Sequence, residues 1–349
     1  MNQKKVIENT IKFVKKELEH AEGGHDWFHV ERVFKNTILI SFTLTCLMFM
    51  NCKTETTEIS KMKNVNESSL KLSLAQWSLH RYVKNEQNSP FDFASQAKQL
   101  GFEGLEYVSQ LYKHEIEKLG FDTVIDSLHL ISKDAGMQNV LIMVDHEGDL
   151  ADPDETKRNE AVENHKKWVD AAEKLGCHSI RVNTFGTNNP EVWKVTVVDG
   201  LKKLSEYAAT KNINILCENH GWLSSDAPKL MEAINLVNMP NCGTLPDFGN
   251  WCVIRDQGER WGECLEVYPD KYEGIEMLLP AAKAVSAKSY DFDENGNETT
   301  LDYSRILQLV KNSSYTNFIG VEYEGTRLSE REGILATKKL LLKSEASLK

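Results

Sequence analysis

From Leu70 onward the chain alternates between short apolar segments, rich in β-branched residues, and longer segments with helical periodicity. The apolar segments have the length and composition of buried strands. They lie at residues 70–78, 104–108, 139–145, 178–185, 213–221, 241–249, 282–290 and 318–325. The amphipathic segments between them, such as "DETKRNEAVENHKKWVDAAEKLG", often end in glycine, which is typical of a helix C-cap. This alternation predicts an α/β fold, a (β/α)8 TIM barrel over residues 70–349, behind a helical and signal-like N-terminal extension.

The alternative architecture is an open, doubly wound sheet. Such a sheet usually carries a glycine-rich phosphate-binding loop after its first strand. The first predicted strand leads instead into "AQWSLHRY", which contains no glycine. The sequence therefore favours the barrel and shows no nucleotide-binding loop.

Residues 35–52 have the organisation of an export signal. Lys35 precedes the apolar run "ILISFTLTCLMFM", and Asn51-Cys52 follows it. The run is too short to span a bilayer, which takes about 20 residues, but it has the length of a signal-peptide core. The segment resembles a bacterial lipoprotein signal, and this resemblance implies lipidation of Cys52. A buried helix or a re-entrant segment is the alternative.

Residues 53–69 are polar and hold no aromatic residue, so we expect a flexible tether between a lipid anchor and the barrel. A working signal would place the protein in the cell envelope, on the periplasmic side or at the cell surface. Without a working signal the protein would be cytoplasmic. In the envelope, unphosphorylated sugars or oxidised glycosides would be more accessible substrates than sugar phosphates.

Residues 1–34 show helical spacing of apolar residues and then the stretch "GGHDWFHVERVF". This stretch resembles the start of the His-Asp phosphohydrolases, whose first metal ligand would correspond to His29. The chain's single His-Asp dipeptide is His25-Asp26, so the second pair that the family needs is missing. One histidine cannot hold a metal. We interpret residues 1–34 as a truncated phosphohydrolase-like head, joined to another protein's signal by a gene fusion or a misassigned start.

The net charge of −11 argues against a nucleic-acid partner and against an anionic membrane surface, because both would repel the protein. Membrane attachment is expected only through the lipid. The seven cysteines form no CxxC pair, and their spacing matches neither a zinc site nor a dense disulfide framework. Cys177 and Cys217 lie beside predicted strands, so we expect them to be buried as small hydrophobic residues.

Polar side chains gather at the C-terminal ends of the predicted strands, where the active sites of TIM barrels lie. In chain order they are Gln76, Trp77, Glu106, Tyr107, Asp145, His146, Glu147, Arg181, Asn183, Glu218, Asn219, His220, Asp247, Asn250, Ser286, Lys288, Glu322 and Glu324. Acidic groups tolerate proximity in a cavity of low dielectric constant only when protons or a cation offset their charge. Glu218, Asp247 and Glu322 follow the fifth, sixth and eighth strands and should face one rim. Carboxylate oxygens suit Mn²⁺ or Mg²⁺, so a divalent metal site is our preferred interpretation.

The segments "GFEGLEYV", "LGCHSIRVN", "ILCENHG", "CGTLPDFGNW" and "FIGVEYEG" resemble strand and strand-end motifs of the xylose-isomerase-like barrels, the sugar phosphate isomerase/epimerase superfamily. The resemblance extends from about Leu72 to Leu342. In that family a Glu, Asp, His and Glu on strands five to eight hold one metal. The resemblance implies Glu218, Asp247 and Glu322 as three of these ligands.

The histidine of the seventh strand is the departure from that pattern. Ser286 stands at its position, and Lys288 follows two residues later. His220, two residues after Glu218, is therefore our candidate for the fourth ligand. The implied ion is Mn²⁺ or Mg²⁺, with Zn²⁺ or Co²⁺ as alternatives. A metal-free site, in which the ammonium group of Lys288 neutralises the acids, is the other interpretation.

The resemblance implies a metal-dependent isomerase or epimerase that acts on a sugar or keto-sugar by α-proton abstraction through an enediolate. We assign the proton transfers to Glu218 and Glu322. The predicted substrate-binding residues are Trp77, Arg181, Asn183, Asn250 and Lys288. Structural ion pairs are the alternative for the two cations, and packing between loops is the alternative for the tryptophan.

Two other functions compete with this one. A keto-sugar or inosose lyase or dehydratase would share the first proton abstraction, so the sequence does not separate the two. A non-catalytic sugar-binding lipoprotein is favoured by the missing histidine. An endonuclease of related fold would need many strand-end histidines and a less acidic surface. The sequence leaves the oligomeric state open, a homo-oligomer included.

Overall fold

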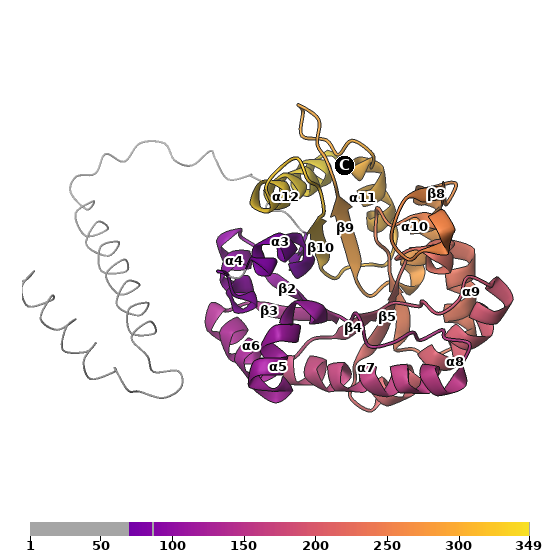
Figure 1. Cartoon of the computed structure of the whole chain (residues 1–349). Helices are drawn as coiled ribbons and strands as arrows, with labels where there is room; N and C mark the ends of the chain where they lie inside the picture. The colour runs from indigo at the N-terminus through magenta and orange to yellow at the C-terminus, as the bar shows by residue number, and fades with distance from the viewer. Residues whose placement is uncertain (1–69, 86, 349) are drawn as a thin grey trace, which may run out of the picture. The chain divides into compact units, whose positions relative to one another are not determined.

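The computed structural model of the protein describes residues 70–85 and 87–348. Eight parallel strands form one sheet in the order β6-β5-β4-β3-β2-β1-β10-β9. They are β1 (Leu72–Ala75), β2 (Gly104–Val108), β3 (Gln138–Met143), β4 (Ser179–Val182), β5 (Asn214–Glu218), β6 (Cys242–Leu245), β9 (Val285–Ser289) and β10 (Ile319–Tyr323). Two parallel bridges, Thr244–Ala282 and Asp247–Ser286, join the two edges, so the sheet closes on itself (Figure 1). This confirms the predicted TIM barrel and excludes the open sheet.

Each of these eight strands lies within a predicted segment or within one residue of it, but most of them are shorter than predicted. The difference lies mainly at the C-terminal ends. After Ala75 the chain turns into a 3-10 helix, Gln76–Leu79, and after Glu218 it leaves the sheet before a second 3-10 helix, Trp222–Ser225. These departures place Gln76, Asn219 and His220 outside the strands at one rim, whereas Glu218, Lys288 and Glu322 remain within their strands.

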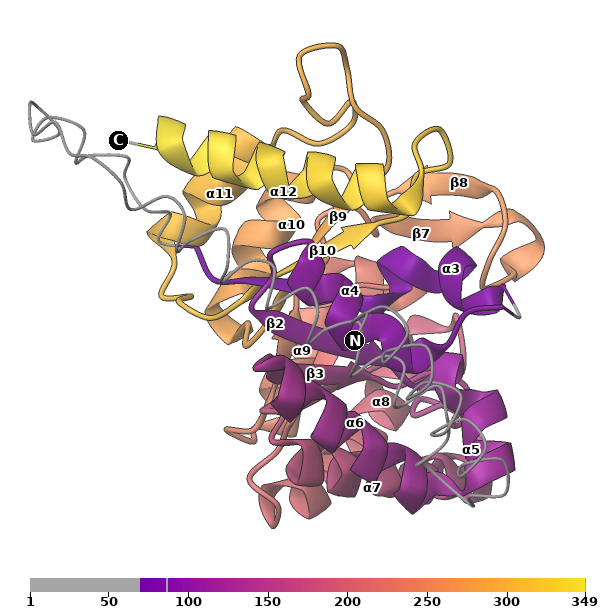
Figure 2. The same cartoon turned by 90° about the vertical axis from the view of Figure 1, so that its left-hand side faces the viewer.

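Helices surround the strands on the outside of the barrel (Figures 1 and 2). They are α3 (His80–Lys84), α4 (Phe93–Gln99), α5 (Lys113–Leu119), α6 (Phe121–Ala135), α7 (Glu155–Leu175), α8 (Pro190–Ala209), α9 (Ala227–Val237), α10 (Lys271–Leu278), α11 (Tyr303–Asn312) and α12 (Glu330–Ser347). The ends of α7 show how the sequence sets the boundaries of a helix. The Asp154 side chain accepts hydrogen bonds from two first-turn amides, and Gly176 ends the helix at φ +75°.

The core has two parts, because alternate strand residues face opposite sides of the sheet. Outward residues such as Leu74, Ile215 and Cys217 pack with the helices, and all three are fully buried. A smaller apolar cluster, to which Leu141 and Leu216 belong, lies on the other face, inside the barrel. The inward residues nearer the C-terminal ends are polar. The barrel therefore has an apolar floor beneath a polar site.

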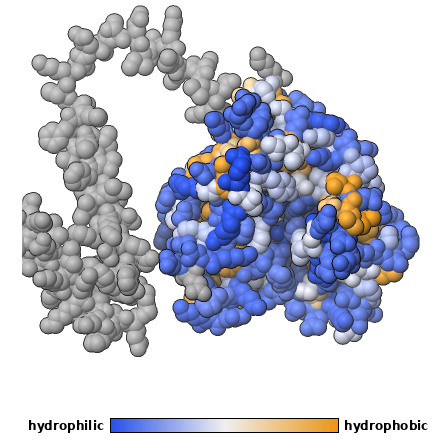
Figure 3. Space-filling model, turned by 45° about the horizontal axis from the view of Figure 1, so that its top comes forward, coloured by the Kyte–Doolittle hydropathy of each residue, from blue (hydrophilic) through white to orange (hydrophobic). Residues whose placement is uncertain are grey.

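A two-stranded antiparallel sheet follows β6: β7 (Cys252–Arg255) pairs with β8 (Cys264–Val267). A disulfide joins Cys252 to Cys264, a pairing that the sequence analysis did not predict. Cys177, Cys217 and Cys242 are free and buried, as predicted for the first two. Exposed apolar side chains on the hairpin include Ile254, Leu265 and Val267. Figure 3 shows a hydrophobic patch on an otherwise mostly hydrophilic face of the molecule.

The predicted head (1–34), signal (35–52), lipidated Cys52 and tether (53–69) lie outside the described residues. Within residues 70–85 and 87–348, no helix has both the length and the apolar character that a membrane-spanning segment needs. The predictions for the N-terminal region remain predictions.

Candidate functional site

Three carboxylates meet at the C-terminal rim of the barrel. Glu218 ends β5, Asp247 follows β6, and Glu322 lies on β10. One oxygen from each lies within 4.8 Å of the other two, and all three residues are buried. We call these residues the carboxylate triad. The structure thus brings together three of the four predicted metal ligands.

The loop after β6 fixes the carboxylate of Asp247. The Asn219 amide donates to the Asp247 carbonyl (2.9 Å), and its oxygen accepts the Asp247 N–H (2.7 Å). Oδ1 of Asp247 accepts two further bonds, from the amides of Gly249 and Asn250, at 2.8 Å each. Oδ2 is buried and finds no hydrogen-bond partner among the described residues. Because a buried oxygen is rarely left unpaired, Oδ2 is available to a cation or a proton.

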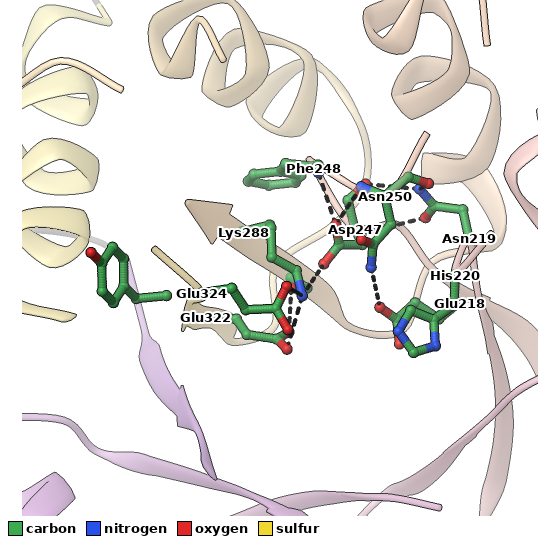
Figure 4. A network of polar contacts seen from close by, with 12 residues as sticks. Glu218, Asn219, His220, Asp247, Phe248, Asn250, Lys288, Glu322 and Glu324 are labelled. Atoms are coloured by element: carbon green, nitrogen blue, oxygen red, sulfur yellow. Dashed lines mark hydrogen bonds and ion pairs between the residues drawn. The ribbon is translucent and has the colours of Figure 1, made fainter. Parts of the chain in front are cut away.

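Lys288 lies against the triad (Figure 4). It pairs with Glu322 in the register of β9 and β10, and it is 1% exposed. Its Nζ is 2.9 Å from Glu322 Oε1, 3.2 Å from Glu324 Oε2 and 3.6 Å from Asp247 Oδ2. Burial alone would disfavour the ammonium ion, but Asp247, Glu322 and Glu324 outweigh it and raise the pKa of Lys288 well above its usual value. Lys288 therefore carries a positive charge into the site.

Ser286 occupies the place where the family resemblance implies a histidine. Its hydroxyl donates to Oε2 of Glu322 at 2.9 Å, and its backbone bridges to that of Asp247. Ser286 thus orients a triad member and adds no nitrogen ligand to the group.

A second ion-pair network holds Glu218. The Arg181 Nε lies 2.8 Å from Glu218 Oε2, and its Nη1 donates to Asp145 Oδ1 at 2.8 Å. The Asn183 amide donates to the same Asp145 oxygen (2.7 Å), and its own oxygen lies 2.6 Å from Nδ1 of His220. His220 therefore bonds to Asn183 and lies outside the carboxylate triad. Burial is the main cause that lowers the pKa of His220 to about 4, so its ring is neutral at pH 7.

Negative charge exceeds positive charge in this site. The acids are Asp145, Glu218, Asp247, Glu322 and Glu324, of which Asp145 and Glu324 are partly exposed, and the cations among them are Arg181 and Lys288. Burial raises the pKa of Glu218 and that of Asp247 to about 7, although Arg181 opposes the shift in the first and Lys288 in the second. Such acids bind protons or a cation near neutral pH. The oxygen donors, including Asp247 Oδ2, which accepts no hydrogen bond among the described residues, fit a divalent cation.

A cavity of about 1040 Å³ opens onto this network. Its walls include six of the predicted site residues, namely Trp77, Arg181, Asn183, His220, Asn250 and Glu322. Asn250 also donates to Oε1 of Glu218 at 3.1 Å, so it connects the cavity wall to the triad. Of the predicted substrate contacts, Arg181 and Lys288 are engaged in ion pairs with the acids.

Some residues of the site were not predicted from the sequence. Asn219 was identified only as a strand-end residue, although it follows Glu218 directly in "ENHG" and fixes Asp247. Phe185, Arg260 and Trp261 also line the cavity. Trp261 and Arg260 come from the β7–β8 hairpin, and nothing in the local sequence pattern signals that this hairpin reaches the cavity.

The family model of the xylose isomerase-like TIM barrel matches residues 94–344 of the chain. The chain belongs to this family. The match spans the strands that carry the triad, and it agrees with the observed barrel. No curated protein is a significant match to the sequence.

Several solved structures have folds similar to that of this chain. One is an IOLI protein with a binding zinc atom, at 16% identity and a TM-score of 0.59, covering 80% of this chain and 99% of that one. A second is a D-psicose 3-epimerase with D-tagatose from Clostridium cellulolyticum, at 14% identity and a TM-score of 0.56, covering 80% of this chain and 97% of that one. A third is the probable 3-DHS dehydratase AsbF from Bacillus anthracis, at 18% identity and a TM-score of 0.53, covering 78% of this chain and 98% of that one. At these identities the likeness shows the shared fold.

Proposed function

We propose that this protein is a metal-dependent isomerase or epimerase that acts on a sugar or keto-sugar by α-proton abstraction. The carboxylate triad carries the proposal, because three buried acids within 4.8 Å of one another need an offsetting charge, and one of them, Glu322, lines a large cavity. Sugar epimerisation by the D-psicose 3-epimerase on the same fold supports the reaction class.

Glu218, Asp247 and Glu322 would hold the metal. When bound there, a divalent cation would polarise a substrate carbonyl and make the adjacent C–H more acidic. Zinc in the IOLI protein supports a metal on this fold, while the oxygen donors here favour Mn²⁺ or Mg²⁺. His220 stays a candidate fourth ligand only if its bond to Asn183 rearranges.

The chain's own groups supply the proton transfers. Burial raises the pKa of Glu218 to about 7 in the metal-free site; a bound cation would lower this pKa and leave the carboxylate ionised, as a general base requires. Glu322 accepts from Ser286 and pairs with Lys288, so its carboxylate is held in one orientation. One glutamate removes the α-proton to leave an enediolate, and the other returns a proton to the neighbouring carbon or to the opposite face. Arg181, Asn183 and Asn250 offer donors to hydroxyls, and Trp77 offers a ring face.

A lyase or dehydratase is the second candidate. It would share the proton abstraction and then expel a hydroxyl group, and the resemblance to a probable 3-DHS dehydratase favours it. The product decides between the two: an epimer keeps the mass of the substrate, and elimination loses water.

The experiment measures α-proton exchange in D₂O on a panel of ketoses and keto-sugars, with Mn²⁺-loaded protein. We expect deuterium incorporation that Glu218→Gln and Glu322→Gln each abolish. The exposed Glu117→Gln is the matched control and should retain exchange. An absence of exchange by the Mn²⁺-loaded protein on every substrate would favour the non-catalytic sugar-binding alternative.

We further propose that the barrel is exported and anchored through Cys52. The disulfide between Cys252 and Cys264 supports this location, because disulfides persist in the periplasm and at cell surfaces and are rare in the cytosol. Incorporation of labelled palmitate, compared with the Cys52→Ala variant, tests the anchor. Equal labelling of the two proteins would refute it.

A further inference from the structure

The cavity is large for one sugar ring. At about 1040 Å³ its volume slightly exceeds the range of about 300–1,000 Å³ that is typical of small-molecule pockets. A single monosaccharide next to the triad would leave much of this volume to water. The part of the cavity away from the triad therefore has room for a second group of the ligand.

Aromatic rings gather on one of those walls. The Trp261 ring lies 5.1 Å from that of His220 and 5.7 Å from that of Phe185, both edge to face, and Phe185 meets Trp222 at 5.4 Å. Phe185, His220 and Trp261 all line the cavity, and we call them the aromatic platform. Trp261 is 54% exposed, so part of its apolar surface is open to a ligand.

Two arginines frame the aromatic platform. The Arg260 guanidinium lies 5.1 Å from the centre of the Phe185 ring and pairs with Asp149. Arg255 donates from Nη1 to the Gly262 carbonyl at 2.7 Å. Its Nε is buried and has no hydrogen-bond partner in the described part of the chain. Arg255 also lines the cavity, so its guanidinium places a second positive charge at the cavity wall.

The aromatic platform is held in place before a ligand binds. Trp261 and Arg260 lie between β7 and β8, whose strands the disulfide Cys252–Cys264 joins. The Trp222 Nε1 donates to the Glu259 carbonyl at 2.9 Å, so the same loop is also fixed to the barrel. A surface held in this way loses little conformational entropy on binding, which favours affinity.

The platform also adjoins the reacting end of the cavity. His220 bonds to Asn183, which bonds to Asp145, the partner of Arg181. We infer that the aromatic platform is a second subsite that binds another sugar ring, so that the substrate is a glycoside carrying the reacting sugar and not a free monosaccharide. Aromatic faces accept the C–H faces of pyranoses, and the arginines donate to hydroxyls. The inference rests on the proposed function for the identity of the first ring.

Calorimetric binding to the full chain tests the subsite. The probes are cellobiose, maltose and laminaribiose, each compared with glucose, their shared constituent. We expect at least one disaccharide to bind about tenfold more tightly than glucose. Trp261→Ala should reduce that ratio to near one. Leu265→Ala, on the same hairpin at 60% exposure and outside the cavity wall, should leave it unchanged.

Glucose affinity equal to that of every disaccharide would overturn the inference, and so would a preference that survives Trp261→Ala. The Glu218→Gln variant separates this result from the proposed function, because binding needs no turnover. A disaccharide preference without α-proton exchange would leave the subsite standing and refute the enzyme. Exchange on monosaccharides without that preference would refute the subsite alone.

Discussion

The Nζ atom of Lys288 lies 2.9 Å from Oε1 of Glu322 and 3.6 Å from Oδ2 of Asp247. A buried ammonium ion therefore sits beside two of the three carboxylates that could hold a metal. Two cations a few ångströms apart repel each other by several kcal/mol at the effective dielectric constant of a protein site, about 20. Lys288 and a divalent ion thus compete for the same negative charge.

Removal of this competitor should tighten metal binding. We expect Lys288→Gln to bind Mn²⁺ at least about tenfold more tightly than the unchanged protein, by calorimetric titration at pH 7. The exposed Lys118→Gln controls for the loss of a positive charge elsewhere. If Lys288→Gln binds Mn²⁺ no more tightly than this control, the ammonium ion and the metal do not compete.

Arg181 should matter more for stability than a surface cation does. Its side chain pairs with Glu218 and Asp145, and all three are largely buried. Arg181→Met would leave two buried carboxylates without their partner, which costs about 3–5 kcal/mol of unfolding free energy. Urea denaturation at pH 7.5 measures this loss.

The cost of Arg181→Met should shrink in acid. Burial raises the pKa of Asp145, but Arg181 outweighs it and holds that pKa below its usual value. In the variant the unpaired acid can accept a proton as the pH falls from 7 towards 4, and the penalty is relieved. The exposed Arg331→Met should show neither the loss nor its pH dependence. A loss under 1 kcal/mol at pH 7.5 would contradict the structural role.

Because of Glu106, the barrel should lose stability as the pH rises from about 4.5 to 8. Burial raises its pKa to about 8, although the Ser73 hydroxyl, 2.5 Å away, opposes the shift. Its carboxyl fills the space beside Gly320, where a Cβ atom would come within 2.5 Å of its oxygens. Between about pH 4.5 and 8 the unfolded chain has released this proton and the folded chain retains it. Stability therefore falls with rising pH, by about 1.4 kcal/mol per unit from this group.

Glu106→Gln isolates this contribution, because the amide oxygen can still accept from Ser73 and never ionises. We expect the variant to lose less stability than the unchanged protein between pH 5 and 8, measured in the presence of EDTA. Glu218 and Asp247 add a slope of the same sign in both proteins, so the difference between the two curves reports Glu106. Parallel curves would show that Glu106 is already ionised in the folded protein.

Much of the fold could be predicted because its signals are local. Most barrel strands lie in short apolar runs, and glycines such as Gly176 end helices at positive φ. The convergence of Glu218, Asp247 and Glu322 also followed from the sequence, since the C-terminal ends of parallel barrel strands share one rim. Once the topology was predicted, strand position alone brought these acids together.

The rest depends on contacts that the linear pattern does not encode. The predicted ligand His220 lies outside the triad because its ring bonds to Asn183, a partner 37 residues earlier. The β7–β8 hairpin has strands of four residues; all of β8 is exposed and only Cys252 of β7 is buried, so neither strand resembles the buried strands of the barrel. Its cysteines, 12 residues apart, gave no pairing signal among seven. Trp261 reaches the cavity only through this hairpin.

Ser286 offers a test of how the site departs from its family. The hydroxyl holds Glu322 at 2.9 Å, in a position that is 1% exposed and bridged to Asp247. Ser286→His would introduce an imidazole into packed surroundings, which costs about 1–3 kcal/mol of unfolding free energy without metal. It would also add a nitrogen ligand to three carboxylates, a set that suits Zn²⁺. We therefore expect a lower melting temperature without metal, but a larger rise on addition of Zn²⁺.

Ser286→Ala is the matched control for that variant. It loses the hydrogen bond to Glu322 and gains no ligand, so its response to Zn²⁺ should not exceed that of the unchanged protein. Direct titration with Zn²⁺ checks the same point without relying on unfolding. Equal Zn²⁺ affinity in the histidine and alanine variants would mean that Lys288, and not the absent histidine, sets the metal affinity of the triad. The double variant Ser286→His/Lys288→Gln should then bind Zn²⁺ more tightly than Ser286→His alone, because only the double variant lacks the competing charge.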